Sequence, residues 1–113
     1  MKTFTIIVYN DPGHAWGKVK RKVIRSLGLE SSISRYSYQL RDNVYLEEDV
    51  DLPLVANALM AGNENVRVVF VEKTTDKTSR IRGYSSYTPQ GYANEGTQLG
   101  SETRYKIQPQ QTA

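Results

Sequence analysis

The pattern of apolar and polar residues predicts a β-strand over residues 3–9. Phe4, Ile6 and Val8 fall on one face, and both faces are fairly apolar, which favours a central position in a sheet. The sequence Asn-Asp-Pro-Gly over residues 10–13 ends this strand. An Asp before a Pro favours a helix start, because Asp caps a first turn well and Pro suits the first helical position.

A helix is predicted over residues 15–27. Its apolar residues recur mostly at spacings of three and four and therefore share one face: Trp16, Val19, Val23, Ile24 and Leu27. Four cations fall together on the opposite side: Lys18, Arg21, Lys22 and Arg25. Gly28 then fits the left-handed position at which many helices end.

A β-hairpin is predicted after this helix. Residues 34–40 alternate apolar and polar side chains, as a half-buried strand does. Residues 41–43, Arg-Asp-Asn, form a tight polar connection, and residues 44–48 return as the second strand.

One more helix and one more strand complete the predicted fold. The helix is expected to be capped by Asp49 or Asp51, to carry a Pro in its first turn and to end at Gly62. Residues 66–72 alternate as a strand. The basic and aromatic residues 79–84 predict a short edge strand or an ordered extension.

The order strand, helix, strand, strand, helix, strand predicts an α+β fold. It is that of a ferredoxin-like βαββαβ two-layer sandwich with an antiparallel sheet. Residues 1–87 are expected to form this single domain. Residues 88–113 are rich in Gln, Gly and Thr and poor in large apolar side chains, so a flexible tail is expected there.

Composition and charge narrow the class of protein. The 113 residues include no Cys, which excludes disulfides, thiolate chemistry and Cys-based metal sites. No apolar run has the length of a membrane span, so an intracellular protein without a membrane partner is expected. The net charge of +3 is unevenly distributed, with six basic and one acidic residue (+5) in residues 1–29 and two basic and seven acidic residues (−5) in residues 30–65.

His14, the only histidine, is the natural candidate for acid–base chemistry. The chain supplies it with no obvious partner, although Asp11 and Asp42 are candidates for approaching it. The acidic run near Glu47 lacks the spacing of a calcium loop and is interpreted as helix capping. We therefore expect no catalytic residue, no metal and no cofactor.

A binding role is favoured for the basic residues. The predicted helix has no acidic residue between positions 15 and 26, which favours contact with phosphates or an acidic protein surface. The candidate binding residues are Lys18, Arg21, Lys22, Arg25, His14, Trp16, Arg80 and Arg82. RNA binding on the sheet face is not expected, because Glu47 would share that face with Tyr45 and oppose a phosphate backbone.

Four motifs carry a resemblance to known sequences. They are Asp-Pro-Gly-His-Ala-Trp from Asp11, Tyr-Ser-Tyr-Gln from Tyr36, Tyr-Leu-Glu-Glu-Asp from Tyr45 and Ser-Arg-Ile-Arg-Gly-Tyr-Ser-Ser-Tyr from Ser79. In this order, over about residues 3–87, they resemble a group of small hypothetical proteins encoded by bacteriophages, prophages and plasmids. The resemblance transfers no functional residue. It implies an accessory protein made in the cytoplasm of a bacterial host.

Three hypotheses follow. The first is a non-enzymatic phage or mobile-element accessory protein that binds a host protein or nucleic acid, for example to counter host defence or to modulate host machinery. The second is a binding protein or enzyme for a small ligand such as a nucleotide, with His14, Asp11 and Trp16 at the mouth of a pocket. The third is a structural or virion-associated oligomer component.

Overall fold

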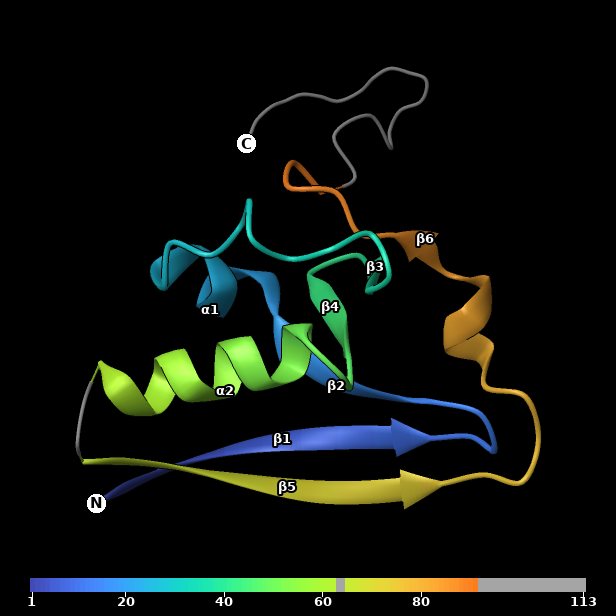
Figure 1. Cartoon of the computed structure of the whole chain (residues 1–113), viewed down its shortest axis with the longest axis horizontal. Coiled ribbons are helices and arrows are strands. Elements are labelled where there is room, and N and C mark those ends of the chain that lie inside the picture. The colour runs from blue at the N-terminus through green and yellow to red at the C-terminus, as the bar shows by residue number, and fades with distance from the viewer. Residues whose placement is uncertain (63–64, 92–113) are drawn as a thin grey trace.

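The protein folds as an α+β domain in which two α-helices pack on a mixed β-sheet (Figure 1). The computed structural model describes residues 1–62 and 65–91, and both α-helices lie in this part of the chain. The helices in this part of the chain are α1 (Arg21–Ser26), α2 (Asp51–Ala61) and the short 3₁₀-helix η1 (Arg80–Gly83). The strands there are β1 (Lys2–Asn10), β2 (Ala15–Lys20), β3 (Tyr38–Leu40), β4 (Asn43–Glu47), β5 (Val66–Thr74) and β6 (Ser85–Ser86).

The strand order corrects the predicted ferredoxin-like sandwich. The six strands lie in the order β5-β1-β2-β4-β3-β6. Strands β1 and β5 pair in parallel, whereas the other neighbouring strands pair antiparallel. The sheet is therefore mixed, and it contains a strand, β2, where the sequence predicted the first two turns of a helix.

Residues 15–20 form a strand because residues 11–14 act as a hairpin turn. The Asp11 N–H donates to the His14 carbonyl at 2.9 Å, and β2 then runs back along β1. Along β2, Ala15, Gly17 and Val19 are buried against the helices. Trp16 and Val19 are three residues apart, a spacing that fits a helix and also a strand that is buried on both faces. The helical spacing was therefore misleading, and α1 starts only at Arg21.

The predictions for the other strands and for the end of the first helix agree better with the structure. The strands predicted over residues 3–9 and 66–72 correspond to β1 and β5, and the predicted hairpin corresponds to β3 and β4, although β3 is only three residues long. Gly28 has a φ of 70°, and the Leu29 N–H donates to the Ile24 carbonyl at 3.1 Å, so the predicted left-handed end of the first helix is confirmed.

The start of α2 uses a different carboxylate from the two that were predicted. Glu47 accepts hydrogen bonds from the N–H groups of Asp49, Val50 and Asp51, each at 2.8 Å. Asp51 is buried, and its Oδ2 instead accepts from the hydroxyl of Ser37 at 2.6 Å and from Ser34. Asp51 thus holds the loop before β3 against the helix, which explains why most of residues 34–40 is not strand.

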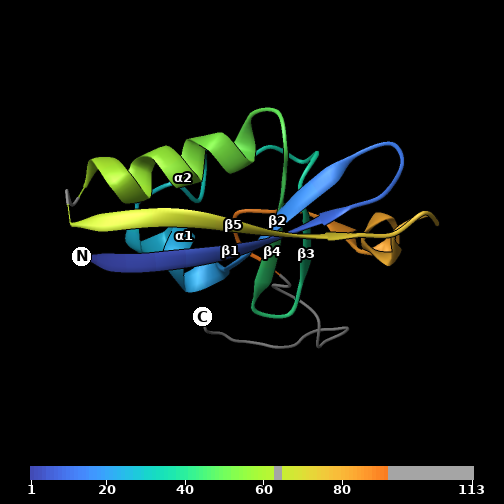
Figure 2. The same ribbon diagram turned by 90° about the horizontal axis from the view of Figure 1, so that it is seen from below.

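One face of the sheet is covered by the helices. Figure 2 shows α2 lying along one side of β1 and β5. The main core joins the sheet to both helices and includes Ile6, Ile24, Leu46 and Val55, none of which is exposed. A Cβ on Gly17 would lie 2.5 Å from Leu52 Cδ1, so the absence of a side chain at this position lets α2 pack closely on β2.

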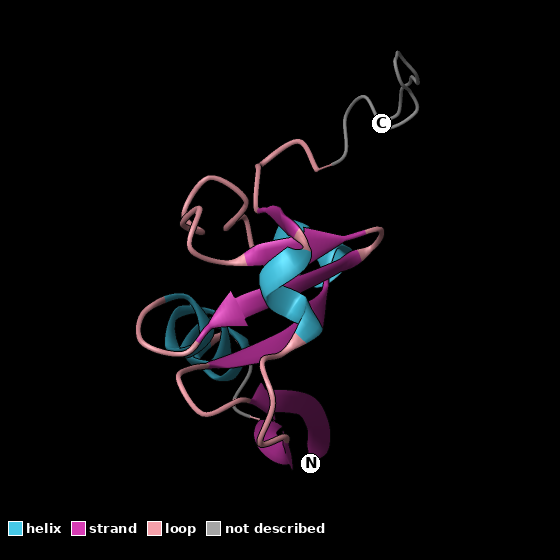
Figure 3. Cartoon of the chain, turned by 90° about the vertical axis from the view of Figure 1, so that its right-hand side faces the viewer, coloured by secondary structure: helices cyan, strands magenta, loops and turns pink. Residues whose placement is uncertain are grey.

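The opposite face of the sheet carries a second, aromatic cluster. Its buried members are Trp16, Tyr45 and Ile81, and four further side chains pack against them: Tyr9, Tyr38, Leu40 and Tyr84. Figure 3 views the molecule from the side on which η1 lies and shows this short helix in front of the strands. The ordered extension predicted for residues 79–84 is thus confirmed, as a 3₁₀-helix that leads into the edge strand β6.

The side chain of Arg21 anchors the segment up to residue 91, where the described part of the chain ends. Its guanidinium lies over the ring of Tyr87, 5.0 Å from the centroid, and donates to Gln39 and to the carbonyl of Thr88 at 3.1 Å. Residues 88–91 are therefore anchored, and the remainder of the predicted tail lies outside the described residues. No helix in the described part of the chain is long and apolar enough to cross a membrane.

Candidate nucleic-acid interface

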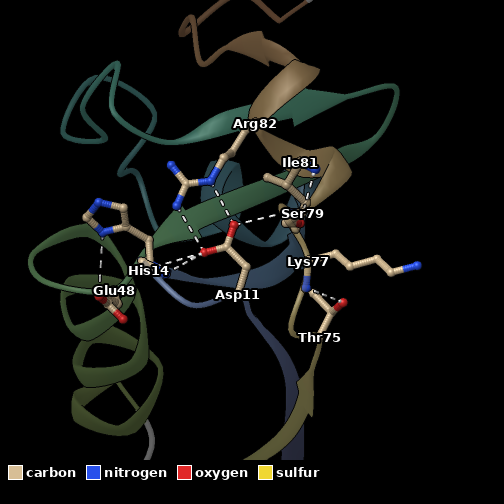
Figure 4. Close-up of polar contacts among 9 residues, drawn as sticks. Asp11, His14, Glu48, Thr75, Lys77, Ser79, Ile81 and Arg82 are labelled. Atoms are coloured by element: carbon tan, nitrogen blue, oxygen red, sulfur yellow. Dashed lines mark hydrogen bonds and ion pairs between the residues drawn. The ribbon is translucent and has the colours of Figure 1, made fainter.

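The carboxylate of Asp11 joins the hairpin turn to the segment that precedes β6. Its Oδ1 accepts from the N–H groups of Gly13 and His14, both at 3.0 Å, and its Oδ2 accepts from the N–H of Ser79 at 3.0 Å. Arg82 donates to both oxygens, through Nε at 2.7 Å and Nη2 at 2.9 Å (Figure 4). An Asp at this position therefore both shapes the turn and anchors a segment almost 70 residues away.

This ion pair is permanently charged. The hydrogen bonds from Arg82, and then the Ser79 N–H, hold the pKa of Asp11 far below its ordinary value, although burial opposes the shift. Asp11 in turn raises the pKa of Arg82. Neither group exchanges a proton near neutral pH, so the pair serves structure and electrostatics rather than acid–base catalysis.

Aromatic rings line the sheet beneath the anchored segment. The Arg82 guanidinium lies over the Trp16 ring at 5.1 Å, and Tyr38 meets the same ring edge-on at 6.1 Å between centroids. Tyr45 contacts Tyr84 at 5.2 Å between centroids. The Asp11–Arg82 pair thus positions aromatic side chains from both the sheet and the segment that crosses it.

A hollow of about 620 Å³ opens beside this segment. Three tyrosines line it, Tyr9, Tyr45 and Tyr84, and two cations, Lys77 and Arg80, lie among its other lining residues. We name it the tyrosine hollow. Rings beside cations form a site that can stack a planar ring and attract a negative charge.

A row of cations lies on the same face of the sheet as the tyrosines. The strand register places Lys18 beside Ile7, Lys73 beside Tyr9 and Arg67 beside Thr3, and Lys20 follows Lys18 two residues along β2. Lys20, Arg67 and Lys73 are exposed and Lys18 is half-buried. We name this set, Lys18, Lys20, Arg67 and Lys73, the basic sheet face.

Glu47 does not oppose this positive surface in the way that the sequence suggested. It pairs with Trp16 in the β2–β4 register, at the end of the sheet. Its carboxylate is engaged by the N–H groups at the start of α2. Burial alone would raise the pKa of Glu47, but these N–H donors more than offset that effect and lower it. The argument against a phosphate backbone on this face is thereby weakened.

The four cations predicted to share a helix face do not do so. Lys18 lies on β2, whereas Arg21 is buried and bonded to the end of the chain. Lys22 and Arg25 are exposed on α1, and Arg25 Nε donates to Glu30 Oε2 at 3.1 Å. These cations do not share a helix face because the helix begins only at Arg21 and residues 15–20 form a strand instead.

The other predicted residues lie near the anchored segment. The His14 side chain is exposed, and its Nδ1 lies 3.8 Å from Glu48 Oε2. Trp16 is only 3% exposed, although it and His14 both line a groove of about 530 Å³. Arg80 lines the tyrosine hollow, and Arg82 is bound to Asp11. The structure thus brings His14, Trp16 and Arg82 together through the turn.

Sequence reasoning missed several residues of this surface. The candidate binding residues did not include Lys20, Lys73, Lys77, Tyr9 or Tyr84. Alternation along β1 and β5 could have placed Tyr9 and Lys73 on one face, whereas Lys77 and Tyr84 lie outside the strands. The pairing that brings β5 beside β1 could not have been deduced from that alternation.

The described residues contain a histidine and acidic side chains, which are residue types that can bind a metal ion. They include no group of three or more His, Cys, Asp or Glu side chains arranged to hold a metal ion. The histidine contacts a carboxylate and an aromatic ring, with ring centroids of His14 and Trp16 6.2 Å apart. No protein-family model, no curated protein and no solved structure matches this chain.

Proposed function

We propose that this chain is a non-enzymatic binding protein for single-stranded nucleic acid. The observation that carries the proposal is the position of four cations, the basic sheet face, on the same side of the sheet as the tyrosine hollow. Phosphates would lie along the cations, and one or more bases would enter the hollow.

The energetic contributions of the two parts differ. Each phosphate neutralised by a Lys or Arg releases counterions, so the basic sheet face gives affinity that falls with salt. Stacking of a base on an aromatic ring contributes about 1–3 kcal/mol and tolerates any base. Tyr9 and Tyr84 are half-buried and retain exposed ring surface for this contact.

A single strand fits the surface better than a duplex does. Stacked bases inside a duplex do not present their faces to tyrosine rings, whereas an unpaired base does. The helices α1 and α2 cover the other face of the sheet, and α1 is only six residues long. A duplex reader usually inserts a longer helix or a ribbon into the major groove.

We further propose a cellular setting for this binding. The resemblance to small proteins of phages, prophages and plasmids supports an accessory role in the cytoplasm of a bacterial host. Such a role includes binding a host nucleic acid, or a nucleic acid of the mobile element itself.

The test is fluorescence anisotropy with a labelled dT₁₂ oligonucleotide. The variant Lys18→Ala/Lys20→Ala/Lys73→Ala removes three cations of the basic sheet face. The matched control Lys2→Ala/Lys22→Ala/Arg35→Ala removes three exposed cations elsewhere and makes the same change in net charge.

We expect the first variant to bind at least about tenfold more weakly at 0.1 M salt. The slope of its affinity against salt concentration should be smaller by about two, because three phosphate contacts on a single strand are lost. The control variant should bind within about twofold of the wild type. Equal losses in both variants would mean that binding follows net charge alone, and the proposed surface would be wrong.

A further inference from the structure

A second concave surface lies on the other flank of the Asp11–Arg82 pair. It is a groove of about 530 Å³, and Arg82 lines it, whereas Arg80 lines the tyrosine hollow. Its aromatic residues come from β2 and from residues 36–38, and its acidic residues come from residues 47–49. We name it the acidic groove, with Trp16, Tyr36, Tyr38, Glu47, Glu48 and Asp49 as its defining residues.

The rim of this groove is unusually apolar for an exposed surface. Tyr36 is 77% exposed and Val50 is 65% exposed, and both line the groove. Exposed large apolar side chains that gather beside a groove are typical of an interaction site rather than of a solvated surface. The high exposure of Tyr36 makes this residue accessible to a ligand.

The charge of the groove selects the kind of ligand. Glu47, Glu48 and Asp49 are acidic, and the Arg82 charge is balanced by its bidentate pair with Asp11. His14 also lines the groove, 3.8 Å from Glu48 Oε2, and with three carboxylates the groove still carries an excess of acidic groups. An anionic ligand such as a nucleotide would be repelled here, and a cation would be attracted.

Arg82 itself shows which cation fits. Its guanidinium lies over the Trp16 ring at 5.1 Å while Asp11 accepts from Nε and Nη2. The groove offers the same two kinds of partner, an exposed ring, Tyr36, and the carboxylates of Glu48 and Asp49. A planar guanidinium uses both partners, because it stacks on rings and donates in a fork to carboxylates.

We propose that the acidic groove binds an arginine side chain of a basic segment in a partner protein. The arginine would stack on Tyr36 and donate to Glu48 or Asp49, and the apolar part of the partner segment would cover Val50. This site uses none of the residues of the basic sheet face or the tyrosine hollow, so the inference does not depend on nucleic-acid binding.

The probe is a penta-arginine peptide, with penta-glutamate as the peptide control. The ¹⁵N-labelled full chain is titrated and the amide shifts of residues 36 and 47–50 are followed by NMR. The variant Glu48→Gln/Asp49→Asn removes two charges while it preserves shape, and Tyr36→Ala removes an exposed ring. The matched control Asp42→Asn/Asp76→Asn removes two exposed acids outside the groove.

The expected result is saturable binding of penta-arginine with shifts at the groove. The affinity should fall about fivefold to tenfold in Glu48→Gln/Asp49→Asn and severalfold in Tyr36→Ala, and it should stay within twofold in the control. Equal weakening in the control, no binding, or shifts outside the groove would overturn the proposal. Dimerisation of the chain that Glu48→Gln/Asp49→Asn abolishes would assign the groove to a second copy and also overturn it.

Discussion

Arg82 donates two hydrogen bonds to Asp11, at 2.7 Å and 2.9 Å, across 71 positions in the sequence. The carboxylate side chain is 1% exposed and the Arg82 side chain is 36% exposed. This pair fixes residues 79–84 over the aromatic face of the sheet. Both proposed binding surfaces flank the fixed segment, so the pair determines their shape.

The first prediction is that Asp11 is more important for stability than any exposed carboxylate of this chain. Asp11→Asn weakens the interaction with Arg82, because the amide carries no negative charge. It also replaces one accepting oxygen with an amide group that faces other N–H donors. We expect a lower Tm in circular dichroism than for the wild type. Asp76→Asn, at an exposed position, is the control and should leave Tm unchanged within about 2 °C. Equal Tm values for both variants would contradict the structural role of the pair.

The second prediction concerns stability at acidic pH. Because the pKa of Asp11 is lowered in the folded state, the unfolded chain binds this proton at higher pH than the folded chain does. The contribution of Asp11 is therefore complete above its unfolded pKa of about 3.9 and is lost progressively as the pH falls below that value. Glu47, whose pKa is also lowered, acts in the same direction.

Urea unfolding from pH 6 to pH 3 measures this effect. The free energy of unfolding of the wild type should fall on acidification below about pH 4, and that of Asp11→Asn should fall less steeply. Parallel curves for the two proteins would show that Asp11 is not the source of the decline.

The third prediction concerns the contact between β2 and α2. Gly17→Ala would place a Cβ 2.5 Å from Leu52 Cδ1 and 3.1 Å from Ile6 Cγ2. We expect a loss of about 1–3 kcal/mol, because a packed core accommodates an added methyl group poorly. Leu52→Ala alone should cost about 2–5 kcal/mol. In the double variant the new methyl group occupies part of the vacated space, so urea unfolding should give less than the sum of the two losses, and strict additivity would refute the proposed contact.

The fourth prediction assigns Arg21 to structure, although the sequence suggested a binding role. Arg21→Met keeps much of the aliphatic stem but removes the donors to Gln39 and to the Thr88 carbonyl. Losing the two hydrogen bonds, one of which is buried, costs about 2 kcal/mol. Faster hydrogen exchange of the Gly91 amide should accompany the loss. The neighbouring exposed variant Lys22→Met should change neither property, and a harmless Arg21→Met would refute the assignment.

The strands β1 and β5 and the helix α2 could be predicted because their local signals agree with their final environments. The segment Ala15–Lys20 could not. Trp16 and Val19 suit a helix by spacing, and Ala15, Gly17 and Val19 suit a strand by alternation. The close approach of Leu52 to Gly17 favours the strand, and this contact depends on a helix 35 residues away.

The residues of the candidate nucleic-acid interface were hard to predict for the same reason. Arg80 and Arg82 were chosen as equivalent basic residues, yet one lines the tyrosine hollow and the other is bound to Asp11. Their difference depends on where the hairpin turn lies in space. Lys73 lies one residue beyond the predicted strand of residues 66–72, and its place beside Tyr9 depends on the parallel pairing of β1 with β5.

The last prediction separates stacking from charge in the proposed nucleic-acid interface. Tyr84 lines the tyrosine hollow and contacts Tyr45, and it is half-buried. Tyr84→Ala should weaken dT₁₂ binding by about 1–3 kcal/mol with an unchanged salt slope, because a ring and not a phosphate contact is lost. Tyr84→Phe keeps the ring and should bind within about twofold of the wild type. Tyr36→Ala, in the acidic groove, should leave dT₁₂ affinity unaltered, so a similar loss in Tyr36→Ala and Tyr84→Ala would show that the hollow is not where the base binds.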